Sequence, residues 1–393
     1  MLHRSGKLEA LFTDYWSRGL WQNLLRSPRL RSRKHEDLSD AEVYSFNGTA
    51  VLDGLRKRVR PNTDAYSEFL RIGSRFGKQV RSKLIKRREQ HWENTILFGY
   101  DTGFLEAAAW AKNEGAHCIV CQMDPSRTEF DLVRAEEKRW PGWAKTPILV
   151  PEAYFDWRKA EWALADAVVV NSQWTLDALV QQGVPTEKIH IIPLAYEAGL
   201  NDNDKSPTPL KPDGEPLRVL FLGQVNLRKG IPYLLEAARL IKNIQVEIAG
   251  PIAIADQFVV KAPPNVRFHG AVTRDRVREF YREADVFVLP TISDGFALTQ
   301  IEAMAHGLPV ITTPHCGQVV TDGLDGFVIP ARDSAALADR LRTLQDDPER
   351  LQAMREAAQL TVRRFSLNHL DKNLRTLEAS VKWPSTDTLP SFH

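Results

Sequence analysis

Residues 284–326 constrain the fold of this chain more than any other stretch. Two short apolar runs flank a polar loop and a segment with helical spacing. Val286–Leu289 is an unbroken apolar run, which is typical of a parallel strand buried on both faces. Residues 297–306 have the apolar periodicity of a helix that ends at Gly307, and 310–313 form a second apolar run. Such a strand–loop–helix–strand unit binds ligands at the carboxyl end of its sheet.

The loop that opens the predicted helix suits an anion. The backbone N–H groups of Gly295, Phe296 and Ala297 precede the helix, and we expect them to point at a bound phosphate. Two acids bracket this turn, Asp294 and Glu302. Each also has an ordinary interpretation, because Asp294 could cap the helix and Glu302 could be a solvated helix charge.

The wider pattern favours ligand binding over those ordinary roles. Asp-Gly-Phe-Ala is followed by Glu302 in Glu-Ala-Met-Ala-x-Gly-Leu-Pro-Val-Ile, and later by Asp-Gly-x-x-Gly-Phe. This series closely resembles the donor-binding segment of glycosyltransferase family 4, whose members are retaining enzymes of GT-B fold. The family's E-x7-E motif is present with Asp294 in place of the first Glu.

The resemblance implies an α/β fold of two Rossmann-like, doubly wound domains that face a cleft. We expect an N-terminal acceptor-side domain at 1–198, a linker at 199–216 and a nucleotide-sugar-binding domain at 217–365. A helix at 366–382 would cross back to the N-terminal domain, followed by a disordered tail at 383–393. Compared with the family, the chain starts inside the first helix, so the first strand of the N-terminal domain is expected to be missing.

A second motif follows the predicted strand Leu217–Leu222, in the loop 223–230. Family members carry an Arg after the first glycine of this loop and a Lys before the second, and both bind the donor's phosphates. Lys229 matches the lysine, although a surface lysine is the simpler alternative. Gln224 replaces the arginine after Gly223, and we expect Arg228 to supply the missing charge. Such cations offset the charge that builds on a departing nucleoside diphosphate.

The resemblance assigns a role to each candidate residue of the C-terminal half. Lys229 and Arg228 would hold the diphosphate, Asp294 the sugar hydroxyls and Glu302 the ribose. Loops near Gly250 and Gly270 would hold the base through backbone atoms. The full set of expected donor-binding residues is Gly223, Gln224, Arg228, Gly270, Gly295, Phe296, Ala297, Leu298 and Glu302.

The N-terminal half supplies one further catalytic candidate. The predicted strand His117–Gln122 ends beside Asp124, where the family often has a His that faces the transferred sugar. Asp124 is therefore a candidate for a residue near the reacting carbon, and its alternative role is to cap the turn before Pro125. We also expect Asp101 or Thr102 to cap a helix at 104–113, and Ser172 to cap the last helix of the N-terminal domain.

Charge is unevenly distributed along the chain. The net charge of +2 is too small to indicate nucleic acid, but Arg and Lys crowd the region 26–88. Residues 24–90 are predicted to be helical and basic. Either this is an ordinary amphipathic helix with a solvated face, or it meets anionic lipid head groups or a phosphate-bearing acceptor. No nucleic-acid-binding motif accompanies the charge.

Cysteine usage and hydropathy indicate the cellular compartment of the protein. Cys118 and Cys121 lie three apart in a predicted strand, so they face opposite sides and a redox or zinc role is not expected. Neither a membrane span nor a signal peptide is predicted, so we expect a cytoplasmic protein, with the inner membrane face as a possible site of action. No cofactor or metal is expected, because Asp202-Asn203-Asp204 lies in the linker as a solvated look-alike of a metal-binding DxD motif.

These expectations combine into a retaining transfer of a sugar from a nucleotide sugar to a glycan or lipid-linked acceptor, in surface polysaccharide or glycolipid biosynthesis. Two alternatives stay open. A non-catalytic nucleotide-sugar binder is favoured by the Asp294 and Gln224 departures, and a nucleotide-sugar epimerase would share the fold but need more acids or histidines. A phosphorylase has no support in the sequence.

Overall fold

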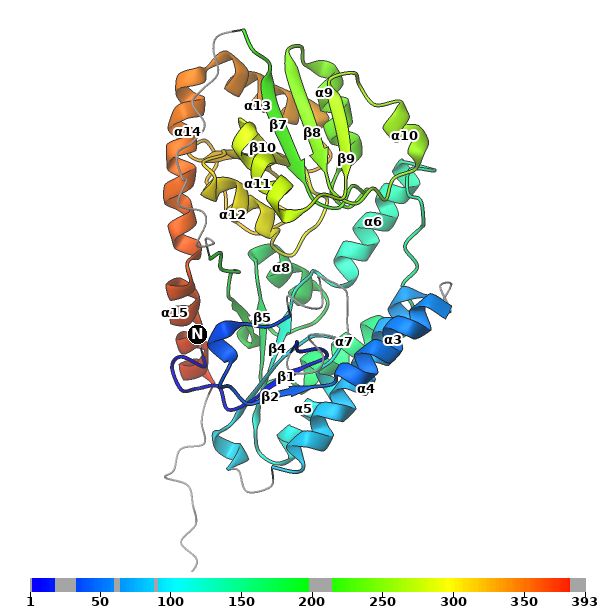
Figure 1. Cartoon of the computed structure of the whole chain (residues 1–393), viewed down its shortest axis with the longest axis vertical. Helices are drawn as coiled ribbons and strands as arrows, with labels where there is room; N and C mark the ends of the chain where they lie inside the picture. Colours follow the sequence, from blue (N-terminus) through cyan, green and yellow to red (C-terminus); the bar gives the residue numbers. More distant parts are fainter. Residues whose placement is uncertain (1, 18–32, 60–63, 88–90, 198–213, 382–393) are drawn as a thin grey trace, which may run out of the picture. The chain divides into compact units, whose positions relative to one another are not determined.

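The computed structural model describes residues 2–17, 33–59, 64–87, 91–197 and 214–381 (Figure 1). Most of the predicted linker, including Asp202-Asn203-Asp204, lies outside these residues, and so does the predicted tail. The chain divides into two compact units. The first comprises 1–121, 149–168 and 378–393, and the second comprises 122–148 and 169–377.

The second unit is built on a six-stranded parallel sheet in the order β12-β11-β10-β7-β8-β9. Its strands are β7 (Leu217–Leu222), β8 (Ile244–Ala249), β9 (Val266–Gly270), β10 (Val286–Leu289), β11 (Val310–Thr312) and β12 (Gly326–Val328). Its later helices are α9 (Ile231–Leu240), α10 (Asp256–Val260), α11 (Arg274–Glu283), α12 (Leu298–Ala305), α13 (Ser334–Asp346) and α14 (Pro348–Thr361).

The strand order places a topological switch point between β7 and β10. From β7 the chain winds through β8 to β9 on one side, and then returns to β10 and β11 on the other. Since parallel crossovers are right-handed, this reversal puts α9 and α11 on opposite faces of the sheet. After the β7 and β10 loops, the chain therefore continues to opposite faces of the sheet. Ligands of doubly wound sheets bind in the crevice at such a point.

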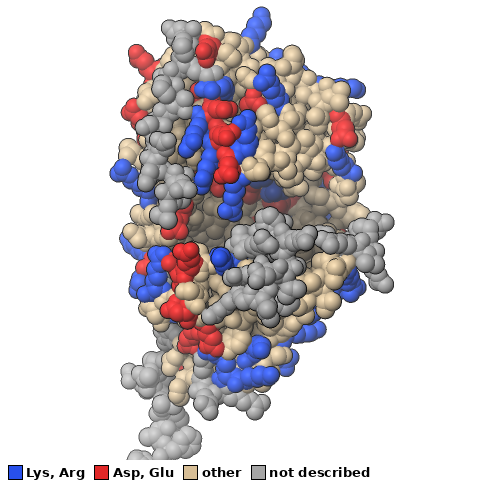
Figure 2. Space-filling model, in the orientation of Figure 1, with Lys and Arg blue, Asp and Glu red and all other residues tan. Residues whose placement is uncertain are grey.

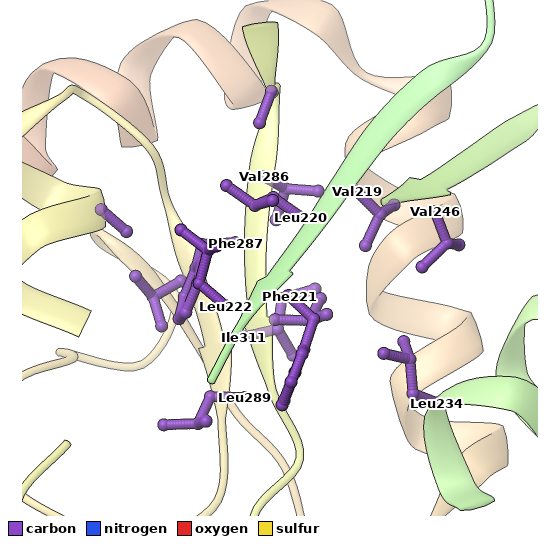
Figure 3. Close-up of a cluster of buried hydrophobic side chains, with 14 of the residues drawn as sticks. Val219, Leu220, Phe221, Leu222, Leu234, Val246, Val286, Phe287, Leu289 and Ile311 are labelled. Carbon is purple, nitrogen blue, oxygen red and sulfur yellow. The ribbon is translucent and has the colours of Figure 1, made fainter. Parts of the chain in front are cut away.

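Apolar side chains from the central strands form the core of this unit. Val219, Phe221, Val286, Phe287 and Leu289 are completely buried, and Figure 3 shows them in one cluster with Leu234 of α9. Strands buried on both faces explain why β10 and residues 219–222 of β7 are continuously apolar rather than alternating. The rigid core fixes the strand ends from which the candidate site projects.

The second unit also contains a segment from the N-terminal half of the sequence. It includes α6 (Arg127–Arg139), α8 (Gln173–Gln181), η3 (Thr186–Lys188) and β6 (Ile189–Ile191). Trp143 follows α6 and stacks on Phe258 of α10, with ring centroids 4.2 Å apart. Tyr233 of α9 donates a 2.6 Å hydrogen bond to the buried Glu136 carboxylate of α6. The end of α6 is thereby packed against the parallel-sheet core.

The first unit contains a short parallel pair, β1 (Leu11–Thr13) and β2 (Val43–Ser45), and helices α3 (Asn47–Val59), α4 (Ala65–Leu84), α5 (Leu105–Asn113) and α7 (Glu152–Leu164). Short 3-10 turns lie at η1 (Glu36–Leu38) and η2 (Trp92–Asn94). Strands β3 (Ile96–Tyr100) and β4 (His117–Gln122) pair in parallel, and the full order of this sheet is β3-β4-β5-β6, with β5 at Ala167–Val170. An α/β fold with two parallel sheets is confirmed.

The predicted crossover helix is present as α15 (Leu367–Ser380), after the short turn η4 (Val362–Phe365). The boundary between the units falls within α15, because residues from Glu378 onward belong to the first unit. Lys7 and Glu378 form an ion pair within that unit.

Two local predictions need correction, and one strand was missed. Residues 24–90 are not helical throughout, because 43–45 form strand β2, which pairs with β1. Neither Asp101 nor Thr102 caps α5 with its side chain. The Glu161 carboxylate of α7 does this instead, by accepting from the backbone N–H groups of Thr102 at 2.9 Å and Phe104 at 3.1 Å. Strand β12 was not predicted, because three residues with a glycine carry little periodic signal.

Two predicted helix caps are confirmed. Ser172 accepts from the Thr175 N–H as the N-cap of α8, and Asp333 caps α13. Cys118 and Cys121 are buried, and burial raises the pKa of each thiol to about 12, so both remain protonated at neutral pH. Within the described residues, every helix is too short or too polar to cross a bilayer.

Candidate functional site

The loop after β7 is held against the end of β10. Gly230 has a left-handed φ of +72°, and a Cβ added there would lie 1.8 Å from the carbonyl oxygen of Pro290. Only glycine combines this backbone conformation with so close an approach. The Ile292 N–H donates to the Arg228 carbonyl at 2.8 Å, and Lys229 N–H donates to Asn226 Oδ1 at 3.0 Å. The two loops are therefore joined at the switch point.

The loop after β10 is equally constrained. A Cβ added at Gly295 would lie 1.9 Å from the Met123 carbonyl oxygen, so this turn passes directly beside the segment after β4. The Asp294 N–H donates to the His315 carbonyl at 2.9 Å. Ala297 precedes α12 with a left-handed φ of 61°, a conformation that costs free energy in a residue with a Cβ. Strain of this kind is concentrated at functional sites.

The amides of this turn are available to a ligand. Among the residues that the structure describes, no protein acceptor lies opposite the backbone N–H groups of Gly295, Phe296 and Ala297. The Phe296 side chain itself is buried and packs edge-on against Phe365, with centroids 5.9 Å apart. Its expected contribution to binding is therefore limited to the backbone. Leu298 is 40% exposed at the start of α12.

Two cations and two carboxylates meet between the loops. Lys229 Nζ forms an ion pair with Asp294 Oδ2. Arg228 Nη1 lies 3.8 Å from Asp294 Oδ2 and 3.5 Å from Glu129 Oε2 of α6. Arg228 also donates to the Ser293 carbonyl at 3.2 Å. Lys229 and Arg228 were predicted as a phosphate-binding pair, and the structure places them together at the switch point.

Burial governs the ionisation of this cluster. Desolvation, followed by the neighbouring Arg228 guanidinium, lowers the pKa of Lys229 to about 7. Desolvation raises the pKa of Glu129, although the Arg228 charge opposes the shift. The buried Lys229 ammonium and the partly exposed Arg228 guanidinium lie side by side, so together they can bind an added anion that displaces their carboxylate partners.

Aromatic rings border the same cluster. Trp174 of α8 stacks on His315 with ring centroids 4.2 Å apart and an interplanar angle of 11°. Its indole Nε1–H donates to Ser293 Oγ at 3.2 Å. Burial lowers the pKa of His315, so this imidazole is neutral at pH 7.

The remaining predicted residues lie in distinct surroundings. Gln224 is exposed, and its Oε1 accepts from Asn226 Nδ2 at 3.1 Å. Gly223 follows β7, and Gly270 at the end of β9 accepts from the Gly250 N–H at 2.7 Å. Glu302 on α12 accepts a 2.9 Å hydrogen bond from the buried Tyr281 hydroxyl. This hydrogen bond fixes the position of the Glu302 carboxylate. A purely solvated helix charge would have no such partner.

Asp124 is engaged in its local turn. Its Oδ1 accepts from the Ser126 N–H at 2.8 Å and from Gln122 Nε2 at 3.3 Å. The alternative capping role is thus present in the structure. Asn171 Nδ2 donates to the Met123 carbonyl at 2.9 Å, which anchors this segment beside Gly295.

Sequence reasoning missed Glu129, Trp174 and His315 as members of the cluster. Glu129 lies in a helix that carries other charges, so its pattern gave no sign of burial. Trp174 is the second residue of α8, two positions after the N-cap Ser172, and that position was the one available signal.

A family of known proteins matches the region that contains the loops after β7 and β10. Residues 216–347 match the model of the family described as Glycosyl transferases group 1. These residues are a glycosyl transferases group 1 domain. The resemblance inferred from the motifs is confirmed.

Curated relatives match over part of the chain. The D-inositol 3-phosphate glycosyltransferase 1 of Catenulispora acidiphila is 27% identical over 53% of this chain and 56% of its own length. The amylovoran biosynthesis glycosyltransferase AmsK of Erwinia amylovora is 28% identical over 41% of this chain and 42% of its own length. The chain spans about half the length of these relatives.

Solved structures share the fold over a longer range. Anabaena HepE in complex with UDP superposes with a TM-score of 0.57 at 14% identity, covering 95% of this chain and all of that one. This similarity supports the GT-B assignment.

Proposed function

We propose that this protein is a retaining glycosyltransferase that moves a sugar from a nucleotide sugar to a glycan or lipid-linked acceptor. The observation that carries the proposal is the buried Lys229 beside the partly exposed Arg228 at the switch point of a group 1 domain, next to the unpaired amides of the Asp294 turn. This arrangement has the charge and the hydrogen-bond donors that a diphosphate requires.

In the proposed donor complex, Lys229, Arg228 and the Gly295–Ala297 amides hold the diphosphate. Asp294 then exchanges its ion pair with Lys229 for the hydroxyls of the sugar. Glu302 holds the ribose, with its carboxylate oriented by the Tyr281 hydroxyl. Backbone atoms near Gly223 and Gly270 hold the base, and Gln224 lies at the exposed edge of this loop.

The proposed chemistry breaks the bond between the anomeric carbon and the leaving phosphate oxygen. The acceptor oxygen forms the new bond to that carbon on the same face, and its proton passes to the departing phosphate. Lys229 and Arg228 stabilise the charge that develops on the nucleoside diphosphate. Asp124 is proposed to lie near the reacting carbon, since its segment borders the Asp294 turn.

The acceptor class is proposed from relatives and from charge. AmsK, by its name, serves amylovoran biosynthesis, which supports a role in surface polysaccharide formation. The basic helix α4 supports peripheral contact with an anionic surface, which would place the enzyme at the inner membrane face. Arg71 and Arg75 of α4 are paired with Asp53, so the exposed charge is carried by Lys78 and Arg81 of this helix and by Lys86 just after its end. Figure 2 shows that basic and acidic side chains intermingle over much of one face of the molecule.

Calorimetric titration with UDP-, GDP-, ADP- and dTDP-sugars tests the donor site. One donor class should bind, and Lys229→Ala should weaken it by about 1–3 kcal/mol. Lys242→Ala, which removes an exposed lysine of the same unit, should leave affinity unchanged. A folded protein that binds none of the four donors would refute the proposal.

Turnover distinguishes a transferase from a non-catalytic binder or an epimerase. A transferase should release nucleoside diphosphate only when an acceptor from a membrane or polysaccharide fraction is present. Donor binding without release in a broad acceptor screen would favour the binder. Conversion of one nucleotide sugar to another without acceptor would favour the epimerase.

A further inference from the structure

Glu129 brings a second carboxylate to the two phosphate-binding cations. It lies in the first turn of α6 and is buried. Its Oε2 accepts from Ser293 Oγ at 3.0 Å and lies 3.5 Å from Arg228 Nη1. Ser293 Oγ in turn accepts from Trp174 Nε1. The carboxylate is thus held in place by groups that are independent of any ligand.

The cluster holds two cationic groups and two carboxylates without a ligand. When all four are ionised, the two positive charges of Arg228 and Lys229 balance the two negative charges of Glu129 and Asp294. A diphosphate must therefore compete with carboxylates for both cations. Asp294 lies in the turn that would bind the sugar, whereas Glu129 is fixed on a helix and remains beside Arg228 when the anion arrives.

The charged groups that face Glu129 come from three parts of the second unit. Arg228 and Lys229 lie on the loop after β7, and their charges favour the ionised carboxylate. Asp124 precedes α6 and disfavours it, as burial does. Asp294, on the loop after β10, reaches the same Arg228, and the Cys316 thiol faces Lys229. Both His315, which is neutral, and the Ser293 hydroxyl complete this environment.

We propose that Glu129 is a positioning residue that holds Arg228 in the phosphate site and limits the affinity of that site for diphosphates. When the nucleoside diphosphate leaves, the Glu129 carboxylate neutralises Arg228 again, which favours product release. This inference rests on the proposed function, because it concerns the product of that reaction.

Glu129→Gln tests the role, because the amide oxygen can still accept from Ser293 while the charge is removed. We expect the variant to bind the nucleoside diphosphate of the preferred base about tenfold more tightly at pH 8. Affinity for the corresponding nucleoside, which has no phosphate, should not change. In turnover, kcat and KM should both fall as product release slows.

The matched control is Asp131→Asn, which removes one carboxylate from an exposed position two residues further along α6. It should leave diphosphate affinity unchanged. Ser293→Ala provides a second variant if Glu129→Gln fails to fold. Loss of the hydroxyl raises the pKa of Glu129, so diphosphate binding should again tighten, though less than in Glu129→Gln.

A pH series separates this role from a structural one. As the pH falls, Glu129 of the wild type becomes protonated, and its diphosphate affinity should approach that of Glu129→Gln. The ratio of the two affinities should therefore shrink toward acid pH. A ratio that is constant across pH, or equal weakening of nucleoside and diphosphate, would overturn the inference.

Inorganic pyrophosphate keeps the two proposals distinguishable. If the wild type binds nucleotide sugars and Glu129→Gln binds diphosphate no more tightly, this inference falls and the proposed function stands. If only pyrophosphate binds, the proposed function falls, and the ratio between wild type and variant still decides the role of Glu129. Failure of every anion to bind would refute both.

Discussion

Lys229 and Asp294 form an ion pair that joins the loop after β7 to the loop after β10. The partners lie on either side of the switch point, at the ends of two adjacent central strands. Lys229 is expected to bind phosphate and Asp294 to bind sugar. In the absence of a donor, their charges thus neutralise each other. Donor binding must separate them.

The first prediction concerns the pH dependence of donor binding. A nucleotide sugar keeps its phosphate charges throughout the neutral range, so the titration of Lys229 is expected to dominate the pH dependence of binding above pH 7. Because the pKa of Lys229 in the empty site is about 7, and a bound diphosphate favours the protonated form, the contribution of Lys229 to affinity should be constant below pH 7 and fall above it. Calorimetry from pH 6 to 9 should show a decrease of up to about tenfold per pH unit above 7.

Lys229→Arg serves as the control for that prediction, since a guanidinium stays protonated throughout the range. Its affinity should not fall above pH 7. A wild type that also lacks this fall would show that Lys229 does not titrate on binding.

A second prediction concerns Glu302 and Tyr281. Glu302→Ala should weaken donor binding by about 1–3 kcal/mol, because it removes a charged acceptor for a sugar hydroxyl. Tyr281→Phe removes only the 2.9 Å hydrogen bond that orients this carboxylate, so its loss should be smaller. Combining the two substitutions should add little to Glu302→Ala alone. Additive losses would mean that Tyr281 acts independently of Glu302.

A third prediction concerns Glu161 and the stability of the first unit. Burial, opposed by the N–H groups of Thr102 and Phe104, raises the pKa of Glu161 to about 7. The folded state therefore binds a proton more tightly than the unfolded state, so stability falls as pH rises from about 4.5 through 7. Glu161→Gln should remove this component, which amounts to a few kcal/mol at most.

The measurement is urea denaturation of the wild type and Glu161→Gln between pH 5 and 8.5, followed by a probe in the first unit. The variant should gain stability relative to the wild type as pH rises. A difference that is independent of pH would place the pKa of Glu161 near its ordinary value.

A fourth prediction concerns Gly230. Gly230→Ala forces a Cβ to within 1.8 Å of the Pro290 carbonyl and strains a left-handed backbone. We expect a loss of stability of about 2–4 kcal/mol together with loss of donor binding. Gly183→Ala has a similar positive φ but open space around the new Cβ, so it should cost only about 1 kcal/mol. Equal costs would mean that the contact with Pro290 is unimportant.

A fifth prediction concerns the basic helix α4. Sedimentation with liposomes should show binding to vesicles that contain anionic lipid, and binding should weaken as salt is raised. Replacing Lys78, Arg81 and Lys86 with Gln should reduce it, while Arg71→Gln should have less effect because Asp53 already neutralises this residue. Binding that is absent, or insensitive to salt, would exclude this surface as a membrane contact.

The sequence by itself determined the elements of the nucleotide-binding half. Strands β7 and β10 and helix α12 lie within a residue of where the apolar runs and helical periodicity predicted them, because elements buried in a parallel sheet carry strong apolar signals. The Lys229 and Asp294 motifs were also recognisable, since both lie in glycine-containing loops directly after such strands.

Only the tertiary structure decided what those residues touch. It paired Lys229 with Asp294, placed the buried Glu129 beside Arg228, and stacked Trp174 on His315. It also assigned the cap of α5 to Glu161, which lies 57 residues from Phe104 in the chain. These contacts join positions far apart in sequence, and burial, which shifts the ionisation of Lys229 and Glu129, is a property of the packed fold rather than of local pattern.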